Sequence, residues 1–150
     1  MKYVECPEEY RGNEKSLFMA GGISNCNLWQ PRYVELLKDT NLVLLNPRRK
    51  VYLDGEGVLE RQITWEFNHL RRANAYSFWF PNETLCPITL FELGKKCVSE
   101  KPFFLGIDPA YTRKRDLEVQ LRLEKPELDI VYSLEDLAGQ VKGALKNGRI

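Results

Sequence analysis

Short apolar runs alternate along the chain with longer segments of helical periodicity, and this alternation is the strongest constraint on the fold. Five runs are predicted to be strands: 16–22, 41–47, 75–80, 102–107 and 129–133. Several of them are apolar on both faces, which is typical of a parallel sheet covered by helices on both sides. Strands joined through helices indicate βαβ crossovers. The sequence therefore predicts a three-layer α/β domain around a five-stranded parallel sheet.

The segments between these runs carry apolar residues at helical spacing. We expect helices over 27–39, 61–73, 87–98 and 115–124, and a last helix that ends near residue 146. Pro87 suits a first helical position, and Ser133 with Asp136 suits a helix cap. Residues 48–60 are expected to form a loop with a short hairpin around Asp54 and Gly55. The length of 150 residues predicts one domain over 1–150, with residues 1–15 as a loose leader.

Composition excludes several classes of protein. With 43% hydrophobic residues the chain can bury a core, and its net charge of +1 gives no indication of polymeric nucleic acid as a partner. No apolar run approaches the roughly 20 residues that a membrane span requires. The N-terminal residues are polar and do not resemble a signal peptide. We therefore expect a cytoplasmic protein without a membrane partner.

The cysteines do not form a metal-binding pattern. The four residues are Cys6, Cys26, Cys86 and Cys97. None belongs to a CxxC pair, and the single histidine, His69, has no cysteine at the spacing of a zinc site. Free thiols in a reducing compartment are the simpler interpretation. The sequence predicts no metal and no cofactor.

Glu66 falls within an apolar stripe of the expected helix 61–73. The stripe consists of Ile63, Phe67, Leu70 and Ala73. A carboxylate on the core-facing side of a helix is costly to desolvate. Two interpretations stay open. Glu66 lies at the edge of the stripe and reaches solvent or an arginine, or it lies at the floor of a pocket, where burial raises its pKa toward values useful in acid–base chemistry.

Glu92 shows the opposite pattern in the expected helix 87–98. The apolar side of that helix consists of Leu90, Phe91, Leu93, Cys97 and Val98. Glu92 points away from this side and precedes Lys95 and Lys96 by three and four residues, a favourable spacing for helical ion pairs. Periodicity alone therefore favours an ordinary surface glutamate.

Gly21 and Gly22 follow the first predicted strand, in the segment AGGIS. Glycines there let backbone N–H groups approach a phosphate or a sugar, and they equally serve a tight turn between a strand and a helix. The segment lacks the lysine of a P-loop, which argues against a nucleoside triphosphate. The basic residues 48–50 and 113–115 suit either a phosphate or a solvated surface.

Four segments in order resemble the nucleoside 2-deoxyribosyltransferase-like family. They are SLFMAGGIS, LLNPRR, QITWEFNHLRRANAYSFWF and PITLFELG, within residues 16–107. The resemblance implies a flavodoxin-like fold and cleavage or exchange of the N-glycosidic bond of (deoxy)nucleosides or their 5′-monophosphates. It also implies a small nucleoside or nucleotide as ligand, and a homodimer or larger homo-oligomer.

The resemblance also implies roles for individual residues. Glu92, in FELG, matches the nucleophile that attacks C1′, and Glu66 matches the acid that handles the sugar and the departing base. Because such a nucleophile must be ionised, we expect Glu92 to carry the charge and Glu66 to be the protonated partner or a sugar anchor. The residues that the resemblance places at the substrate are Phe18, Gly21, Gly22, Ser24, Asn46, Arg48 and Gln62.

Three positions depart from the family pattern and leave alternatives open. Phe18 stands where well-studied relatives have tyrosine, Cys86 stands where they have an acid, and Asn74 stands where they have aspartate. One alternative is a nucleoside 5′-monophosphate N-glycosidase, with Ser24, Arg48 or Arg49 on the phosphate. The other is a nucleotide-binding module without catalysis, which the three departures motivate.

Overall fold

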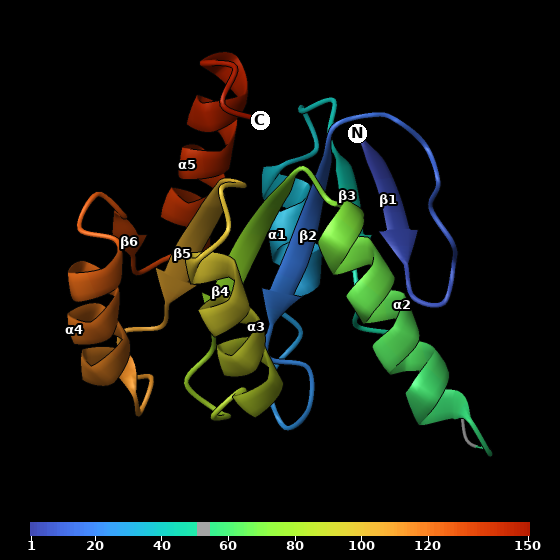
Figure 1. Cartoon of the computed structure of the whole chain (residues 1–150), viewed down its shortest axis with the longest axis horizontal. Coiled ribbons are helices and arrows are strands. Elements are labelled where there is room, and N and C mark those ends of the chain that lie inside the picture. Colours follow the sequence, from blue (N-terminus) through green and yellow to red (C-terminus); the bar gives the residue numbers. More distant parts are fainter. Residues whose placement is uncertain (51–54) are drawn as a thin grey trace.

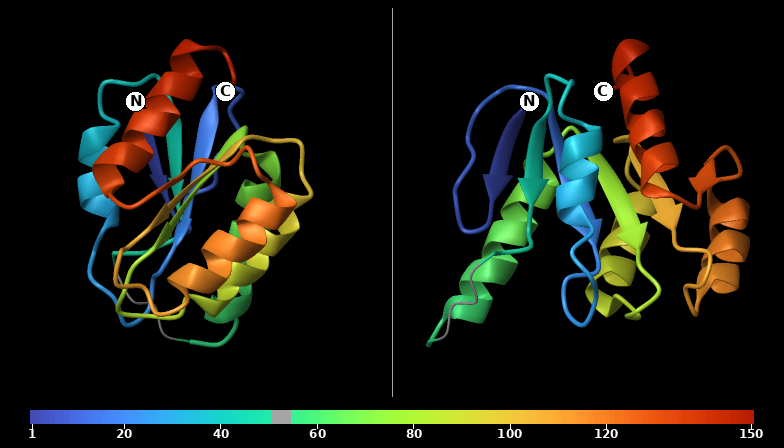
Figure 2. Two further views of the ribbon diagram at one scale, coloured as in Figure 1. Left: turned by 90° about the vertical axis from the view of Figure 1, so that its left-hand side faces the viewer. Right: turned by 180° about the vertical axis from the view of Figure 1, so that it is seen from behind.

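The computed structural model describes residues 1–50 and 55–150 and contains one parallel sheet. Its six strands lie in the order β1 (Lys2–Glu5), β3 (Val43–Asn46), β2 (Ser16–Gly21), β4 (Ala75–Phe80), β5 (Phe103–Ile107) and β6 (Ile130–Val131). All of them point toward the same edge of the sheet (Figures 1 and 2). Without β1, the order is the one found in flavodoxin-like domains. The expected parallel α/β architecture is confirmed, with six strands instead of five.

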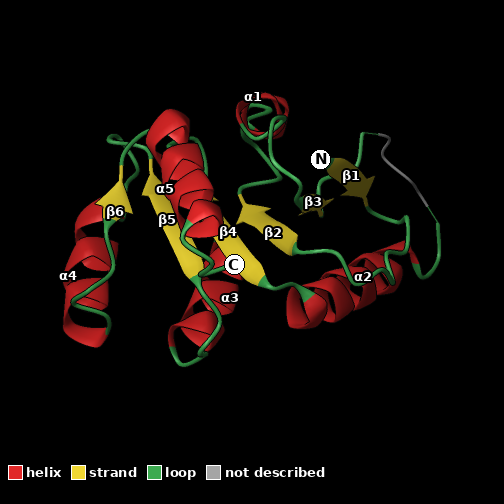
Figure 3. Ribbon diagram, turned by 90° about the horizontal axis from the view of Figure 1, so that it is seen from above, coloured by secondary structure: helices red, strands yellow, loops and turns green. Residues whose placement is uncertain are grey.

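Helices cover both faces of the sheet (Figure 3). One face is covered by α1 (Gln30–Leu36) and α5 (Leu134–Lys146), and the other by α2 (Val58–Arg72), α3 (Pro87–Cys97) and α4 (Lys114–Glu124). Each layer of helices has its own apolar core against the sheet. The strands β2, β4 and β5 are buried along their whole length, as a sheet covered on both faces requires.

The sixth strand comes from residues expected to form a loose leader. β1 pairs in parallel with β3, with Lys2 opposite Val43 and Glu5 opposite Asn46. The segment after β1 is also attached, because the indole N–H of Trp65 donates to the carbonyl of Glu8 at 2.7 Å. The expectation of a loose segment over 1–15 is wrong for these residues. An edge strand that fully buries only Val4 has too little apolar sequence to be recognised.

The helices α2 and α3 turn only part of their predicted apolar sides to the core. Leu70 and Ala73 of α2 are buried as predicted, as are Leu93 and Cys97 of α3. In α2, Ile63 and Phe67 are 54% and 49% exposed, whereas Trp65 and His69 are buried. In α3, Phe91 and Val98 are exposed, and the buried residues are Thr89, Leu93 and Cys97. Both helices carry apolar residues on two sides, so periodicity could not show which side meets the sheet.

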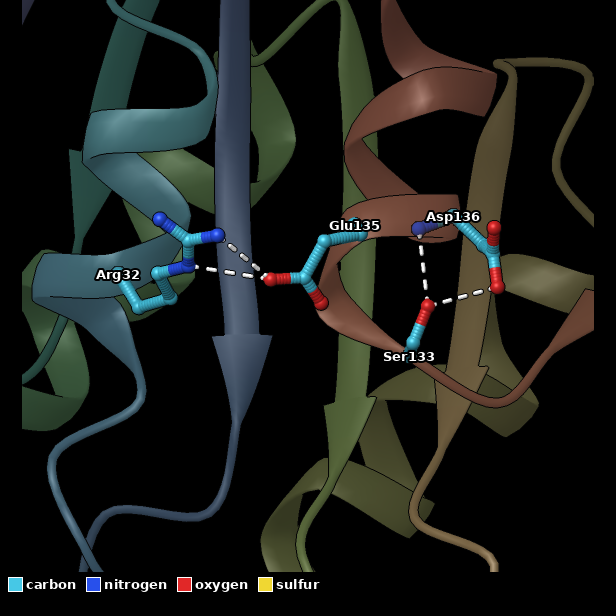
Figure 4. A network of polar contacts seen from close by, with 4 residues as sticks. All are labelled: Arg32, Ser133, Glu135 and Asp136. Atoms are coloured by element: carbon cyan, nitrogen blue, oxygen red, sulfur yellow. Dashed lines mark hydrogen bonds and ion pairs between the residues drawn. The ribbon is translucent and has the colours of Figure 1, made fainter.

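The cap of α5 is confirmed, because the backbone N–H of Asp136 donates to the Ser133 hydroxyl at 3.0 Å. Next to it, the guanidinium of Arg32 in α1 donates to a carboxylate oxygen of Glu135 at 2.8 Å, a surface contact between the two helices (Figure 4).

The hairpin expected around Asp54 falls on residues 51–54, outside the described residues. Within the described part of the chain, every helix is too short or too polar to cross a bilayer.

His69 attaches the N-terminal segment to α2. Its side chain is completely buried, and its Nε2 accepts a hydrogen bond from the backbone N–H of Tyr10 at 3.1 Å. Its Nδ1 lies 2.8 Å from the carbonyl of Trp65, so the proton sits on Nδ1. The ring also stacks on Trp65 at 4.0 Å. His69, the single histidine of the chain, is therefore a structural residue.

We predict that His69→Ala lowers the free energy of unfolding by about 3 kcal/mol, because it leaves a cavity and an unpaired backbone N–H. Urea titration followed by circular dichroism measures the change. Thr64→Ala, at an exposed position of the same helix, is the control and should change stability by less than about 0.5 kcal/mol. Equal stability of the two variants would contradict the role assigned to His69.

Candidate active site

Two glutamates from neighbouring helices interact with each other. Glu66 is the ninth residue of α2 and Glu92 the sixth of α3, and both are partly buried. The charge of Glu66 raises the pKa of Glu92, so the two carboxyl groups share one environment. They are 26 positions apart in the sequence. The parallel crossovers β3–α2–β4 and β4–α3–β5 bring them together on one face of the sheet.

Burial is the main influence on Glu92. Burial, together with the charge of Glu66, raises the pKa of this carboxyl group from 4.5 to about 7, although the charges of Lys95 and Lys96 oppose the shift. The prediction of an ordinary surface glutamate is therefore wrong. The dipole of α3 does not offset this rise in pKa. Its effect is strongest in the first turn of the helix, and Glu92, at the sixth position, lies beyond that turn.

Glu66 holds its charge more readily. Burial raises the pKa of Glu66 as well, but a hydrogen bond from Gln62 and the positive charge of Arg49 both lower it. These influences favour Glu66 as the carboxyl group that ionises first and Glu92 as the one that keeps its proton. This is the reverse of the order expected from the sequence.

Gln62 positions Glu66. Its amide Nε2 donates to Glu66 Oε1 at 2.5 Å and to the carbonyl of Pro47 at 2.7 Å. Its Oε1 accepts a hydrogen bond from the thiol of Cys6 at 3.3 Å. One turn of α2 is thereby linked to the loop after β3 and to the residue that follows β1. The sequence placed Gln62 at the substrate; in the structure its amide is occupied by these three contacts.

Gly21 and Gly22 serve close packing at the end of β2. A Cβ atom on Gly21 would lie 2.5 Å from Trp29 Cζ2, and one on Gly22 would lie 2.6 Å from Pro81 Cγ. The carbonyl of Gly22 accepts hydrogen bonds from the indole of Trp29 at 2.9 Å and from the amide of Gln30 at 3.3 Å. These contacts favour the interpretation of a tight turn between strand and helix.

Asn46 and Arg48 brace the same turn from β3. The guanidinium of Arg48 donates to the carbonyls of Cys26 and Asn27, each at 2.9 Å. The backbone N–H of Arg48 donates to Asn46 Oδ1 at 3.0 Å. Arg48 therefore holds the loop that contains Ser24, whose side chain is exposed.

Phe18 and the two other departures from the family pattern lie in three different settings. Phe18 is fully buried, and its ring lies 6.3 Å from that of Trp65 in the core beneath α2. Asn74 precedes β4, and its Oδ1 accepts hydrogen bonds from the backbone and the hydroxyl of Ser16 at 2.8 and 3.0 Å. Asn74 thus lies at the starting edge of the strands and ties β4 to β2. The change from aspartate to asparagine at position 74 therefore affects contacts at the start of the strands. The glycine turn that follows β2 lies at their opposite ends.

Cys86 caps the start of α3 in an unusual backbone conformation. It is buried, and its φ of 51° lies in the left-handed region, which is rare for residues other than glycine. Burial raises the pKa of its thiol to about 12, so the side chain stays uncharged at neutral pH. A relative with an acid at this position would carry a charge there that this chain lacks.

Cys6 and Arg49 are two further residues whose environment includes Glu66. The periodicity of the sequence gave no indication that they belong near this glutamate. Cys6 is buried, its charge environment includes Arg49 and Glu66, and burial raises the pKa of its thiol to about 11. It reaches α2 only because β1 pairs with β3. No local signal in the sequence reveals that pairing.

A space of about 460 Å³ lies elsewhere, beneath the N-terminal segment. Its lining includes Tyr10, Arg11, Glu14, Arg72 and Asn74. It does not include Glu66 or Glu92. Among the residues that the structure describes, no three side chains of His, Cys, Asp or Glu are grouped closely enough to hold a metal ion.

The fold and the paired glutamates define a parallel α/β protein with two interacting acids on one face of its sheet. Residues 14–111 match the model of the family described as nucleoside 2-deoxyribosyltransferase like, which is about two thirds of the chain. The chain belongs to this family, and the family indicates a nucleoside deoxyribosyltransferase-like function at that general level. A comparison with curated proteins found no match.

We predict that Glu92→Gln stabilises the protein at pH 8. The pKa of Glu92 is higher in the folded chain than in the unfolded one, so folding takes up a proton between pH 4.5 and about 7, and stability falls as the pH rises through that range. The variant should be up to about 3 kcal/mol more stable than the parent at pH 8, with a smaller difference at pH 5. Urea unfolding at both values measures this.

Glu100→Gln, at an exposed position just after α3, is the control and should follow the parent protein at both pH values. If the parent and Glu92→Gln lost stability equally between pH 5 and pH 8, the buried environment assigned to Glu92 would be wrong.

Proposed function

We propose that the protein cleaves or exchanges the N-glycosidic bond of (deoxy)nucleosides, with Glu92 as nucleophile and Glu66 as its acidic partner. The observation that carries this proposal is the interaction of the two carboxyl groups from neighbouring helices. Two like charges in a partly buried setting are unfavourable for stability, and such arrangements are concentrated at functional sites. Membership of the family supplies the substrate class.

The proposed reaction has two displacements at the same carbon. The carboxylate of Glu92 attacks C1′, a C1′–O bond forms as the C1′–N bond breaks, and the bonding electrons leave with the base, which takes up a proton from solvent water. Water or a second base then attacks C1′ and releases Glu92. Attack by water makes the protein a hydrolase, and attack by a base makes it a transferase. Glu66, which ionises first, is suited to accept hydrogen bonds from the sugar hydroxyls, the anchoring role among those expected for it.

A panel of deoxynucleosides and their 5′-monophosphates, each with and without an acceptor base, tests this proposal. We predict base release or exchange by the parent protein, and a loss of at least about 1,000-fold in Glu92→Ala because the attacking group is removed. Glu100→Ala should retain the parent rate. Undiminished release by Glu92→Ala would contradict the assigned nucleophile. Calorimetric binding without any base release by the parent would favour the binding module.

The pH dependence of the rate separates a nucleophile from an acid. Because Glu92 must be ionised to attack, we predict that kcat/KM rises with pH around a midpoint near 7. The charge of Glu66 raises the pKa of Glu92, so Glu66→Gln should move the midpoint to lower pH as well as slowing the reaction. A rate that falls through pH 7 would indicate that Glu92 acts as an acid instead.

A second candidate is a nucleoside 5′-monophosphate N-glycosidase. The observation in its favour is the positive charge of Arg49, which lowers the pKa of Glu66 and would attract a phosphate bound near it. The carbonyl contacts of Arg48 make Arg49 the better candidate of the two. Preference for nucleosides over monophosphates in the same panel would count against this function.

The family resemblance also leads us to propose a homo-oligomer. The single domain over 1–150 and the cytoplasmic location remain predictions of the sequence.

A further inference from the structure

The space of about 460 Å³ beneath the N-terminal segment has a volume typical of small-molecule sites in proteins. We refer to it as the N-terminal cavity. Part of its lining comes from the chain between β1 and β2, which returns to the sheet alongside the last turns of α2 (Figure 1). The cavity is lined by residues 10–14, Ser16, Leu45, His69, Arg72 and Asn74. Because Ser16 begins β2 and Asn74 directly precedes β4, it lies at the starting edge of the strands.

Residues 10–14 form a well-packed wall of this cavity. The backbone N–H of Tyr10 donates to Nε2 of His69 at 3.1 Å. The Tyr10 hydroxyl donates to a carboxylate oxygen of Glu14 at 2.5 Å and accepts from the backbone N–H of Glu14 at 3.1 Å. A Cβ atom on Gly12 would lie 2.6 Å from the Tyr10 hydroxyl oxygen, so glycine allows this close approach. The protein's own contacts therefore hold the wall in place, and such a preformed site costs little to order when a small molecule binds.

Three side chains of the cavity have hydrogen-bond donors that the protein leaves free or uses weakly. Asn74 Oδ1 accepts from the backbone and the hydroxyl of Ser16, and the amide Nδ2 of Asn74 has no partner among the described residues. Arg11 is exposed and forms no ion pair within residues 1–50 and 55–150. Nη1 of Arg72 lies 3.8 Å from a carboxylate oxygen of Glu9, a weak pair because both side chains are about half exposed. Guanidinium and amide donors of this kind bind oxyanions.

The charges of the lining favour an anion that also carries hydroxyl groups. Arg11 and Arg72 are positive and Glu14 is negative, so two charges less one leave the lining at +1. The hydrogen bond from Tyr10 and the charge of Lys2 lower the pKa of Glu14, so its carboxylate stays ionised and can accept hydrogen bonds from hydroxyl groups. A phosphate group has three acceptor oxygens where a carboxylate has two, and it therefore matches two guanidinium groups and one amide better.

We propose that the N-terminal cavity is a binding site for a small phosphate monoester with hydroxyl groups, such as a sugar phosphate. Arg11, Arg72 and the amide of Asn74 bind the phosphate oxygens, and the carboxylate of Glu14 accepts hydrogen bonds from the hydroxyl groups. The cavity does not include the paired glutamates, so it is a second site, and the proposal does not depend on the reaction proposed above. A ligand there contacts both the N-terminal segment and the end of α2, and so stabilises the folded chain.

Titration with glucose 6-phosphate, followed by the backbone amide signals in nitrogen-15 NMR spectra, tests this proposal with the full chain. The probe has a phosphate and hydroxyl groups but no N-glycosidic bond, so it is not a substrate of the proposed reaction. We predict saturable shifts of the signals of residues 10–16 and 72–74. Glucose, which lacks the anion, and glucuronate, which has a carboxylate instead of the phosphate ester, should each bind at least about 10-fold more weakly.

Variants of the two arginines test the assigned residues. Arg11→Ala and Arg72→Ala should each raise the dissociation constant for glucose 6-phosphate at least about 10-fold, because each removes charge-assisted hydrogen bonds to the phosphate. The control is Arg71→Ala, since Arg71 is the exposed neighbour of Arg72 and does not line the cavity. It should bind like the parent protein. The amide spectra also show whether each variant is folded.

A titration without saturable shifts would overturn the proposal. So would shifts confined to the glycine turn after β2 and the surroundings of Glu92, which would place the ligand at the candidate active site instead. Glucuronate that binds as tightly as glucose 6-phosphate would overturn the choice of a phosphate, and unchanged binding by both arginine variants would overturn the assigned cavity. None of these results bears on base release from nucleosides, so the two proposals can fail separately.

Discussion

The burial of the sheet on both faces is the constraint on which the rest of the structure depends. A parallel strand can return to the sheet only through a crossover, and the crossovers after β3 and β4 place α2 and α3 on the same face. Glu66 and Glu92 therefore lie on the same face of the sheet, although 26 positions separate them. The same constraint gives each helix one side toward the sheet and leaves its other side to solvent or to a partner.

The architecture was predictable from the sequence because β2, β4 and β5 are apolar without interruption. β1 was missed, since an edge strand with one fully buried residue has no such signal. The orientation of α2 was missed for a different reason. Its sequence places Trp65 and His69 on one side and Ile63 and Phe67 on another, and periodicity cannot rank two apolar sides. The second side, with Ile63 and Phe67, is the exposed one.

The roles of Glu66 and Glu92 remain predictions, and the structure adds the electrostatics of the pair. The resemblance to the family selected Glu66 and Glu92, whereas the helical pattern of α3 made Glu92 an exposed ion-pair partner. Their order of ionisation depends on contacts from distant segments. Gln62 and Arg49 lower the pKa of Glu66, and burial together with the charge of Glu66 raises that of Glu92. Such contacts exist only once β1, the loop after β3 and α2 have assembled.

The central claim is that the two carboxyl groups form one interacting pair, and titration of the glutamate side chains by carbon-13 NMR tests it most directly. We expect the carboxyl resonance of Glu92 to titrate near pH 7, and to move to lower pH in Glu66→Gln. Assignment of the resonance comes from its loss in Glu92→Gln. A Glu92 resonance that titrates near pH 4.5, and is unchanged by Glu66→Gln, would contradict the account.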